Sequence, residues 1–385
     1  MPTASRRRVV LLGATGSIGR QACEVIARFP DSFELIGAVS GHDVTALAEI
    51  GERFGVTRLA VVGPGAGVAV PAGIAVGEQA ACEIAALEAD VVCVGVSGAA
   101  ALRPTLAALD AGNDVAIATK EVLVMAGELV RSRAAENGAR LLPVDSEHSA
   151  LWQCLRGEDT ATVARLLLTA SGGPFRDRPL DTFEGITVDE ALHHPNWVMG
   201  PKITVDSATM MNKGLEIIEA HFLFDIPYAR IDVVLHPPSV VHSCVEFSDG
   251  ATIAQLGLPD MRLPIALALN DGVRLPGICD AVDLTATVPL EFHPVDPARF
   301  PAVALARQAG EVGGAAPCVL NAANEAAVAA FLEGRCRFVD IVPLVAETLE
   351  AATLPAEPGL DELIALDSWA RAGVAHACAA AEVAR

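Results

Sequence analysis

The chain has 385 residues, of which 52% are hydrophobic and 4% aromatic, so it can form two or three domains with mainly aliphatic cores. Its formal net charge of −21 argues against nucleic acid or an anionic membrane surface as a partner. The nine cysteines are scattered without a CxxC pair, which is typical of reduced thiols. Since no apolar run approaches the ~20 residues of a membrane span, we expect a soluble, cytoplasmic protein.

The chain opens on a predicted strand, a glycine turn and a helix. Residues 9–12 (VVLL) predict a buried strand, residues 13–19 (GATGSIG) a turn, and residues 21–29 a helix. Glycines in such a turn let the backbone approach a pyrophosphate, which then lies at the positive N-terminus of the helix. The spacing is GxxGxxG rather than GxGxxG, so a tight turn without a ligand stays open as an alternative for this motif alone.

Strands and helices continue to alternate as far as residue 145. We predict strands over 33–40, 58–62, 90–96, 114–118 and 140–144, and helices over 44–54, 78–88, 99–111 and 121–137. This alternation predicts an α/β domain over residues 1–145, built on a doubly wound, Rossmann-like parallel sheet. Ligands of such sheets bind at the carboxyl ends of the strands. Residues 40–43, 96–98, 119–121 and 145–147 fall at those ends.

The pattern changes after residue 145. Strands predicted over 163–169, 231–236, 244–247 and 252–256 follow one another without regular helices between them. We therefore predict a central α+β catalytic domain over 146–270. Residues 271–296 are rich in Pro, Gly and Asp and predict a linker, whereas residues 297–385 are rich in Ala and predict a C-terminal α-helical domain.

Three carboxylates are candidates for a metal site. If the backbone is extended at Asp145 and Glu147, their side chains point the same way, and Glu216 supplies a third carboxylate. A set of carboxylates without cysteine or clustered histidine favours a hard ion such as Mg²⁺ or Mn²⁺. The alternative is that Asp145 or Ser146 only caps a helix predicted over 147–155.

A second group of residues is suited to a phosphate. Ser171 begins an SGG sequence at the end of a predicted strand, where hydroxyl and amide donors can converge on an anion. Ser207 and Asn212 add donors, and Lys213 adds a cation. Lys213 and Glu216 are three residues apart and share a helix face, so a plain surface ion pair is the alternative.

Three further features allow two interpretations each. Residues 194–200 (HPNWVMG) predict a lid in which Trp197 closes over a site, although a tryptophan packed in the core explains it equally well. Lys120 is either an ordinary surface lysine or a group that faces the substrate. Asp43 is either a ribose ligand or a helix N-cap, so the loop 40–43 does not decide between NADH and NADPH.

Seven sequence motifs resemble those of a known family. They are GATGSIG, TKE, LPVDSEHSAL, TASGGPFR, HPNWVMGPKITVDSATMMNKGLEIIEAHFLF, DMRLPIALAL and LNAANEAAVAAF. With them the chain resembles the 1-deoxy-D-xylulose 5-phosphate reductoisomerases along nearly its whole length. The resemblance implies an N-terminal NADPH domain, a catalytic domain, a linker and a helical C-terminal domain. It also implies a divalent cation, Mg²⁺ or Mn²⁺, and a homodimer.

The resemblance assigns roles residue by residue. It implies a metal site at Asp145, Glu147 and Glu216, and a lid that includes Trp197 and Met199. The substrate residues that it implies are Lys120, Ser146, Glu147, Ser171, His194, Ser207, Asn212, Lys213 and Glu216. The NADPH residues that it implies are Thr15, Gly16, Ser17, Ile18, Gly41, His42, Asp43, Thr119, Glu121 and Gly200. We expect Asp206, Thr209, Glu219 and His221 to have supporting or structural roles.

The implied reaction is a metal-dependent rearrangement of the carbon skeleton followed by reduction with NADPH. Its product is 2-C-methyl-D-erythritol 4-phosphate, in the non-mevalonate pathway to isoprenoid precursors. Thr119 stands where the family usually has Asn, and its hydroxyl can still offer one hydrogen bond to the cofactor. The alternatives are a simpler NADP-dependent sugar-phosphate dehydrogenase and a catalytically inactive NADP-binding regulator.

Overall fold

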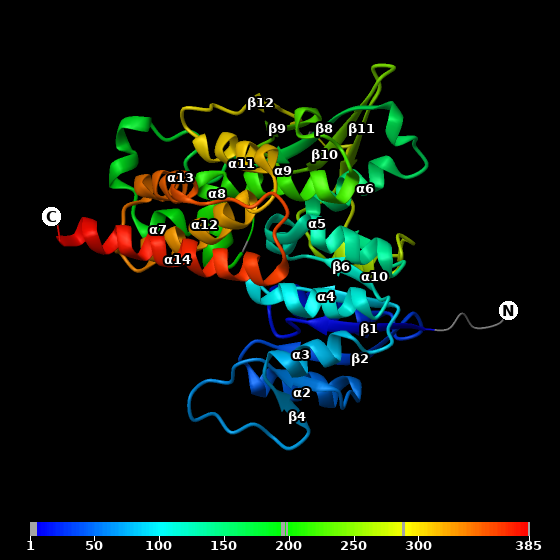
Figure 1. Cartoon of the computed structure of the whole chain (residues 1–385). Helices are drawn as coiled ribbons and strands as arrows, with labels where there is room; N and C mark the ends of the chain where they lie inside the picture. The colour runs from blue at the N-terminus through cyan, green and yellow to red at the C-terminus, as the bar shows by residue number, and fades with distance from the viewer. Residues whose placement is uncertain (1–5, 194–196, 198, 287–288, 384–385) are drawn as a thin grey trace. The chain divides into compact units, whose positions relative to one another are not determined.

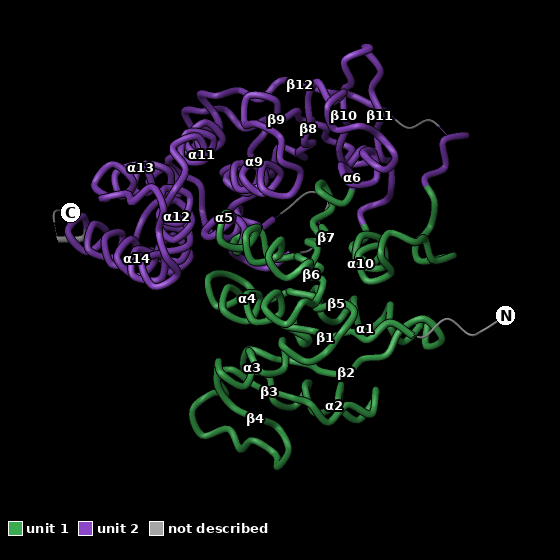
Figure 2. The backbone as a smooth tube through the Cα atoms, turned by 45° about the vertical axis from the view of Figure 1, so that its right-hand side comes forward, with its two compact units in different colours: residues 1–122, 128–149, 260–281 green, residues 123–127, 150–259, 282–385 purple. Residues whose placement is uncertain are grey.

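The computed structural model describes residues 6–193, 197, 199–286 and 289–383. The chain forms two compact units (Figure 2). Unit 1 comprises residues 1–122, 128–149 and 260–281, and unit 2 comprises residues 123–127, 150–259 and 282–385. The predicted fold class is confirmed, because a parallel sheet with helices, a second sheet and a helical C-terminal region are all present (Figure 1).

Unit 1 is organised around a seven-stranded parallel sheet in the order β4-β3-β2-β1-β5-β6-β7. Its strands are β1 (Arg7–Leu12), β2 (Phe33–Ser40), β3 (Leu59–Val61), β4 (Ile74–Val76), β5 (Val91–Val94), β6 (Asp114–Ile117) and β7 (Leu141–Pro143). The sequence did not predict β4, which is short and mostly exposed. The strand order reverses at β1, and ligands of doubly wound sheets bind at such a point, here between the carboxyl ends of β1 and β5.

The helices of unit 1 cover both faces of the sheet, since right-handed crossovers on either side of β1 place them on opposite faces. They are α1 (Ser17–Arg28), α2 (Val44–Phe54), α3 (Glu78–Ala85), α4 (Leu102–Asp110), most of α5 (Lys120–Glu136), and α10 (Arg262–Leu269). Helix α10 contacts α1, and its residues 264–269 are buried. The segment 260–281 thus belongs to unit 1, although the sequence-based boundaries divide it between the catalytic domain and the linker.

Unit 2 contains a five-stranded sheet in the order β11-β10-β8-β9-β12. Its strands are β8 (Val163–Ala170), β9 (Ile231–Leu235), β10 (Val241–Phe247), β11 (Thr252–Leu256) and β12 (His293–Pro294). The β8–β9 pair is parallel, and the other pairs are antiparallel. Helix α9 (Met211–Phe224) contacts β8 and β9, and Ile217 and Ala220 join the apolar core over that sheet.

The C-terminal helices share a core with the central part of unit 2. These helices are α11 (Pro301–Val312), α12 (Ala316–Leu332), α13 (Ile341–Ala351) and α14 (Leu360–Val383); unit 2 also contains α7 (Val188–Ala191), α8 (Pro201–Thr209) and most of α6 (Ser146–Leu155). One apolar cluster joins α8 and α9 to α11, α12 and α13. A Cβ added at Gly214 would lie 2.5 Å from the Ala306 Cβ, so only small residues allow α9 and α11 to approach this closely.

None of the helices in the described part of the chain has the length and apolar character needed to cross a membrane. All nine cysteines have free thiols. Burial raises the pKa of the Cys23 thiol to about 11 and that of the Cys93 thiol to about 12. Both thiols are therefore protonated and unreactive at neutral pH.

Candidate active site

The glycine turn after β1 is packed tightly against its neighbours. Gly13 has a φ of +84°, and a Cβ added there would lie 2.4 Å from the Gly95 carbonyl oxygen. A Cβ added at Gly19 would lie 2.3 Å from the Gly13 carbonyl oxygen. Helix α1 therefore begins directly against the turn, and the backbone N–H groups of its first turn face outward from the strand end as a nucleotide phosphate requires. The exposed Gly16 and Ser17 lie at this helix start.

We expect Gly19→Ala to raise the KM for NADPH about tenfold or more, because overpacking of this kind costs about 1–3 kcal/mol and separates α1 from the turn. Gly19 is helical, so the methyl group acts through contact alone. Gly63→Ala is the matched control, since a Cβ added at Gly63 meets nothing within 4 Å. Fluorescence titration with NADPH measures the effect. If Gly19→Ala and Gly63→Ala bind NADPH with equal affinity, the turn is not part of the nucleotide site.

The loops after β2 and β6 carry the other predicted cofactor residues of unit 1. Gly41 and His42 are exposed, whereas the Asp43 side chain accepts a hydrogen bond from the Ala46 amide at 3.0 Å and caps α2. The Thr119 hydroxyl is buried and lies 2.6 Å from the Val96 carbonyl oxygen, to which it donates. The hydroxyl proton of Thr119 is thus already donated within the protein. Thr119 can therefore only accept a hydrogen bond from a cofactor.

Asp145 and Glu147 lie at the end of β7, but not on an extended backbone. Helix α6 begins at Ser146, so the extended geometry considered from the sequence is wrong here. The helix start still keeps the two acids together, with ligand oxygens within 4.8 Å of one another. The Ser146 hydroxyl donates to Glu147 Oε2 at 2.6 Å, and Lys120, which is 5% exposed, forms an ion pair with Asp145. Because Lys120 is buried and paired with a carboxylate, its interpretation as an ordinary surface lysine is excluded.

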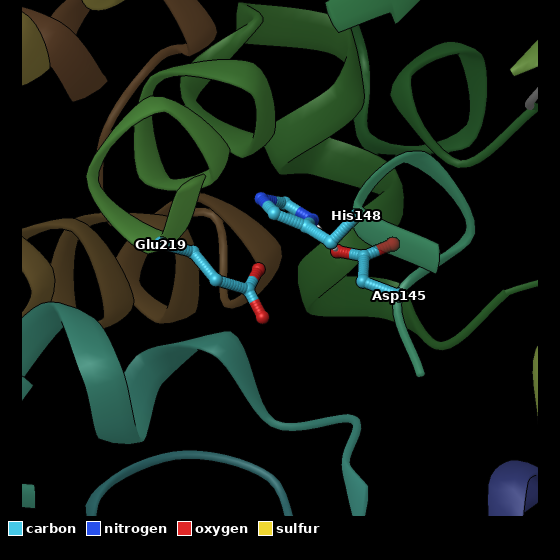
Figure 3. A group of neighbouring side chains, drawn as sticks. All are labelled: Asp145, His148 and Glu219. Atoms are coloured by element: carbon cyan, nitrogen blue, oxygen red, sulfur yellow. Dashed lines mark ion pairs between the residues drawn. The ribbon is translucent and has the colours of Figure 1, made fainter. Parts of the chain in front are cut away.

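His148 belongs to the same end of the sheet, although sequence reasoning gave it no role. It is fully buried one turn along α6, and its Nδ1 lies 3.9 Å from an Asp145 carboxylate oxygen (Figure 3). The spacing of three residues along a helix was the signal available in the sequence. Glu219, which Figure 3 also draws, comes from α9 of unit 2 and is fully buried as well.

A left-handed residue joins α8 to α9. Met210 has a φ of +63°, which is uncommon for a residue with a side chain, and its side chain is held in a cluster with Ala170, Leu235 and Phe300. This elbow turns the chain between Ser207 on α8 and the first turn of α9. The predicted phosphate residues on either side of Met210 are thereby parts of one compact corner.

The first turns of α9 hold a buried ion pair. Lys213 is 4% exposed, Glu216 is fully buried, and Lys213 Nζ lies 2.5 Å from Glu216 Oε2. Asn212 Nδ2 donates to Glu216 Oε1 at 2.5 Å. Burial of this kind is costly unless the charges are paired, so the alternative of a solvated surface pair is excluded.

The SGG loop packs directly against α8. Gly172 and Gly173 have φ values of +85° and +66°, and a Cβ added at Gly173 would lie 2.6 Å from the Ser207 carbonyl oxygen. The loop is held from the other side by Arg176, whose Nη1 donates to the Ser171 carbonyl oxygen at 2.9 Å. Sequence reasoning missed Arg176, although it stands in the word TASGGPFR. The Gly173 backbone therefore lies directly against Ser207.

We expect Gly173→Ala to raise the KM for the phosphorylated substrate by about tenfold or more, since the methyl group separates the two serine-bearing segments and a left-handed alanine is strained. Gly157→Ala is the control, because Gly157 also has a positive φ, +85°, but a Cβ added there meets nothing within 4 Å. Steady-state kinetics separates the effect of backbone strain, which both variants share, from the effect of the contact with Ser207, which only Gly173→Ala changes. A substrate KM unchanged in both variants would contradict a role for that contact in substrate binding.

The predicted lid is described only in part. His194 lies outside the described residues, together with 195, 196 and 198. Trp197 is half-buried, with its ring centroid 6.4 Å from that of His242, and Gly200 is exposed at the N-cap of α8. Met199 is also half-buried. His221 has a structural contact, since its Nδ1 lies 2.8 Å from the Ile226 carbonyl oxygen.

One unit thus has a dinucleotide-type sheet with a carboxylate pair, and the other has a glycine loop packed against α8 and a buried lysine–glutamate pair on α9. These features define the class of nicotinamide-dependent enzymes that act on small phosphorylated substrates. Comparison with known proteins identifies the family. Residues 9–127 match the family model described as 1-deoxy-D-xylulose 5-phosphate reductoisomerase. Residues 141–224 and 256–373 match models of two C-terminal domains of that enzyme.

Curated relatives match the chain over nearly its whole length. The 1-deoxy-D-xylulose 5-phosphate reductoisomerase of Pelotomaculum thermopropionicum is 49% identical over 95% of this chain and 97% of the relative. The same enzyme of Nocardia farcinica is 52% identical over 96% of this chain and 94% of the relative. The chain therefore belongs to the 1-deoxy-D-xylulose 5-phosphate reductoisomerase family.

Solved structures agree with this assignment. The enzyme from Zymomonas mobilis in complex with NADPH has a TM-score of 0.89 and 42% identity, covering 97% of this chain and 99% of the other. A reductoisomerase in complex with NADPH, fosmidomycin and magnesium has a TM-score of 0.89 and 37% identity, covering 98% and 99%.

Proposed function

We propose that this chain catalyses the NADPH-dependent conversion of 1-deoxy-D-xylulose 5-phosphate into 2-C-methyl-D-erythritol 4-phosphate, with a divalent cation. The observation that carries the proposal is the corner formed by α8 and α9, where Asn212 and Lys213 contact the buried carboxylate of Glu216 and Ser207 lies three residues before the elbow at Met210. Family membership along 95% of the chain supports the same reaction.

NADPH binds at the carboxyl end of the unit 1 sheet in this proposal. The pyrophosphate lies at the N-terminus of α1, where Thr15 to Ile18 form the turn. The Thr15 and Ser40 hydroxyl oxygens are 2.8 Å apart, which fixes the turn after β1 against the end of β2. The loop of Gly41, His42 and Asp43 contributes at the ribose end.

The residues present fit a divalent cation. Asp145 and Glu147 form a carboxylate pair, and Glu216 is a buried carboxylate that already requires a positive neighbour, supplied here by Lys213. We propose that these three acids hold Mg²⁺ or Mn²⁺, since oxygen ligands of this kind suit both ions. When bound, the cation polarises the substrate oxygens and stabilises the negative charge that develops during the rearrangement.

The remaining residues bind and orient. Ser171, Ser207, Asn212 and Lys213 grip the phosphate, whose binding energy orients the reacting end of the substrate. Lys120, Ser146 and His194 hold the substrate oxygens. Trp197 and Met199 close over the substrate and exclude water. NADPH, when bound, would supply the hydride for the reduction of the rearranged aldehyde.

An assay of NADPH oxidation with 1-deoxy-D-xylulose 5-phosphate, with and without magnesium, tests this function. We expect turnover only with the metal, and a branched carbon chain in the NMR spectrum of the product. An unbranched product would instead indicate a simple sugar-phosphate dehydrogenase. NADPH binding without any turnover would indicate an inactive regulator.

We further propose a homodimer in the cytoplasm. The family resemblance supports the dimer, and nine scattered cysteines without a CxxC pair support a reducing compartment. Light scattering on the purified protein checks the assembly, and a monomeric mass at micromolar concentration would contradict the dimer.

A further inference from the structure

A buried polar contact joins α8 to the C-terminal helix α12. Asp206 is 1% exposed and Asn324 is fully buried. Asn324 Nδ2 donates to Asp206 Oδ1 at 2.7 Å, and Lys202 Nζ lies 2.9 Å from Asp206 Oδ2. One oxygen of this buried carboxylate thus accepts a hydrogen bond from the neutral amide on α12, and the other forms an ion pair with the lysine in the first turn of α8.

The sequence around Asn324 is mainly apolar, and its other polar residues are Asn321 and Glu325. Helix α12 reads APCVLNAANEAAVAAFL, and most of its residues pack into the apolar core of unit 2. A polar side chain in such a helix lowers stability unless it is hydrogen-bonded, so packing alone gives no reason for Asn324. Its described partner on α8 gives the reason.

Asp206 immediately precedes Ser207, and Lys202 follows two residues after Gly200 at the end of the predicted lid. Because residues along a helix are rotated by a fixed angle, any turn of α8 about its axis that breaks the Asn324 contact also moves the Ser207 hydroxyl. The same rotation of α8 moves Gly200 at its N-terminal end. Asp206 is therefore placed to fix the positions of both the Ser207 hydroxyl and the start of α8.

We propose that Asp206 and Asn324 are a positioning pair, through which the C-terminal helices set the orientation of α8 and thus of the phosphate-binding Ser207. The inference rests on the proposed function for the role of Ser207. It gives the C-terminal region a part in substrate binding, although Asn324 itself touches neither substrate nor cofactor.

Asn324→Leu tests the pair, because leucine is close to asparagine in size and removes the donor. We expect the KM for 1-deoxy-D-xylulose 5-phosphate to rise about tenfold, with the KM for NADPH changed less than about twofold. The inhibition constant of inorganic phosphate, used as a competitive inhibitor, should rise by the same factor as the substrate KM. A KM for the sugar phosphate equal to that of the wild type would overturn the proposal.

Asn321→Leu is the matched control. Asn321 is also fully buried on α12, one turn earlier, but donates to Glu325 of the same helix at 3.1 Å. A variant that merely loosens the helical core should lose melting temperature without change in either KM. If both leucine variants raise the substrate KM alike, the effect is general destabilisation and the pair has no positioning role.

A reciprocal exchange provides the rescue. Asn324→Asp places two carboxylates face to face, and adding Asp206→Asn restores one donor and one acceptor. We expect the double variant to recover phosphate inhibition relative to Asn324→Asp alone, and failure to recover would count against the pair. Phosphate binding measured by calorimetry needs no turnover, so a chain that binds phosphate but does not convert the sugar phosphate contradicts the proposed function and leaves this inference standing.

Discussion

Glu216→Gln is expected to abolish turnover and to leave NADPH binding almost unchanged. The amide keeps the shape of the fully buried side chain and can still accept the hydrogen bond from Asn212. It removes the charge that a hard cation requires, so we expect kcat to fall by about 10³-fold or more. The magnesium-dependent oxidation of NADPH measures the loss, and fluorescence titration measures the nucleotide affinity.

Glu325→Gln is the matched control for that experiment. Glu325 pairs with Arg371 at 2.7 Å in the C-terminal helices of unit 2 and has no predicted metal role. The control should lose some stability and keep its dependence on magnesium. If Glu216→Gln retained turnover near that of the wild type, Glu216 would not be a metal ligand.

Lys213→Met is expected to show its largest effect on stability when magnesium is absent. The substitution leaves the Glu216 carboxylate buried without its lysine, and breaking a buried pair in this way costs about 3–5 kcal/mol of unfolding free energy. A divalent cation at Glu216 replaces the missing charge, so saturating magnesium should recover much of the loss. Since Lys213 also grips the phosphate, the substrate KM should rise about a hundredfold.

Denaturant unfolding with and without magnesium measures this recovery. Lys202→Met is the control, because Lys202 also pairs with a buried carboxylate, that of Asp206, but at a place without a predicted metal. Magnesium should not rescue the control. An equal gain from magnesium in both variants and in the wild type would mean that the ion does not act at Glu216.

Much of the fold was predictable because its signals are local. Alternating strands and helices up to residue 145 specify a parallel sheet, and the Ala-rich segment after residue 297 specifies helices. Strand β4 was missed because it has three residues, two of them exposed, and so lacks a period. Helix α10 is strongly apolar, but periodicity cannot tell which sheet a helix will cover, and α10 packs against α1.

The site was predictable in its residue types and less so in its geometry. Three carboxylates, a lysine and a run of serine and glycine suggested metal and phosphate chemistry, but their types alone left a helix cap and a surface ion pair as alternatives. No local rule predicts that Met210 adopts a left-handed conformation, because the surrounding packing imposes it. Asn324 was equally out of reach, since its partner Asp206 lies 118 residues away in the sequence.

The return of the chain to unit 1 at residues 260–281 has a consequence for biosynthesis. A nascent chain that ends at residue 149 lacks α10, whose buried residues 264–269 complete the apolar cover over α1. The ribosome must therefore translate strands β8 to β11 of the second sheet before the nucleotide-binding unit can finish folding. During that interval unit 1 lacks the apolar helix that packs against α1, so we expect the partly synthesised chain to be a target for chaperones, and a fragment cut at residue 149 to be a poor candidate for separate expression.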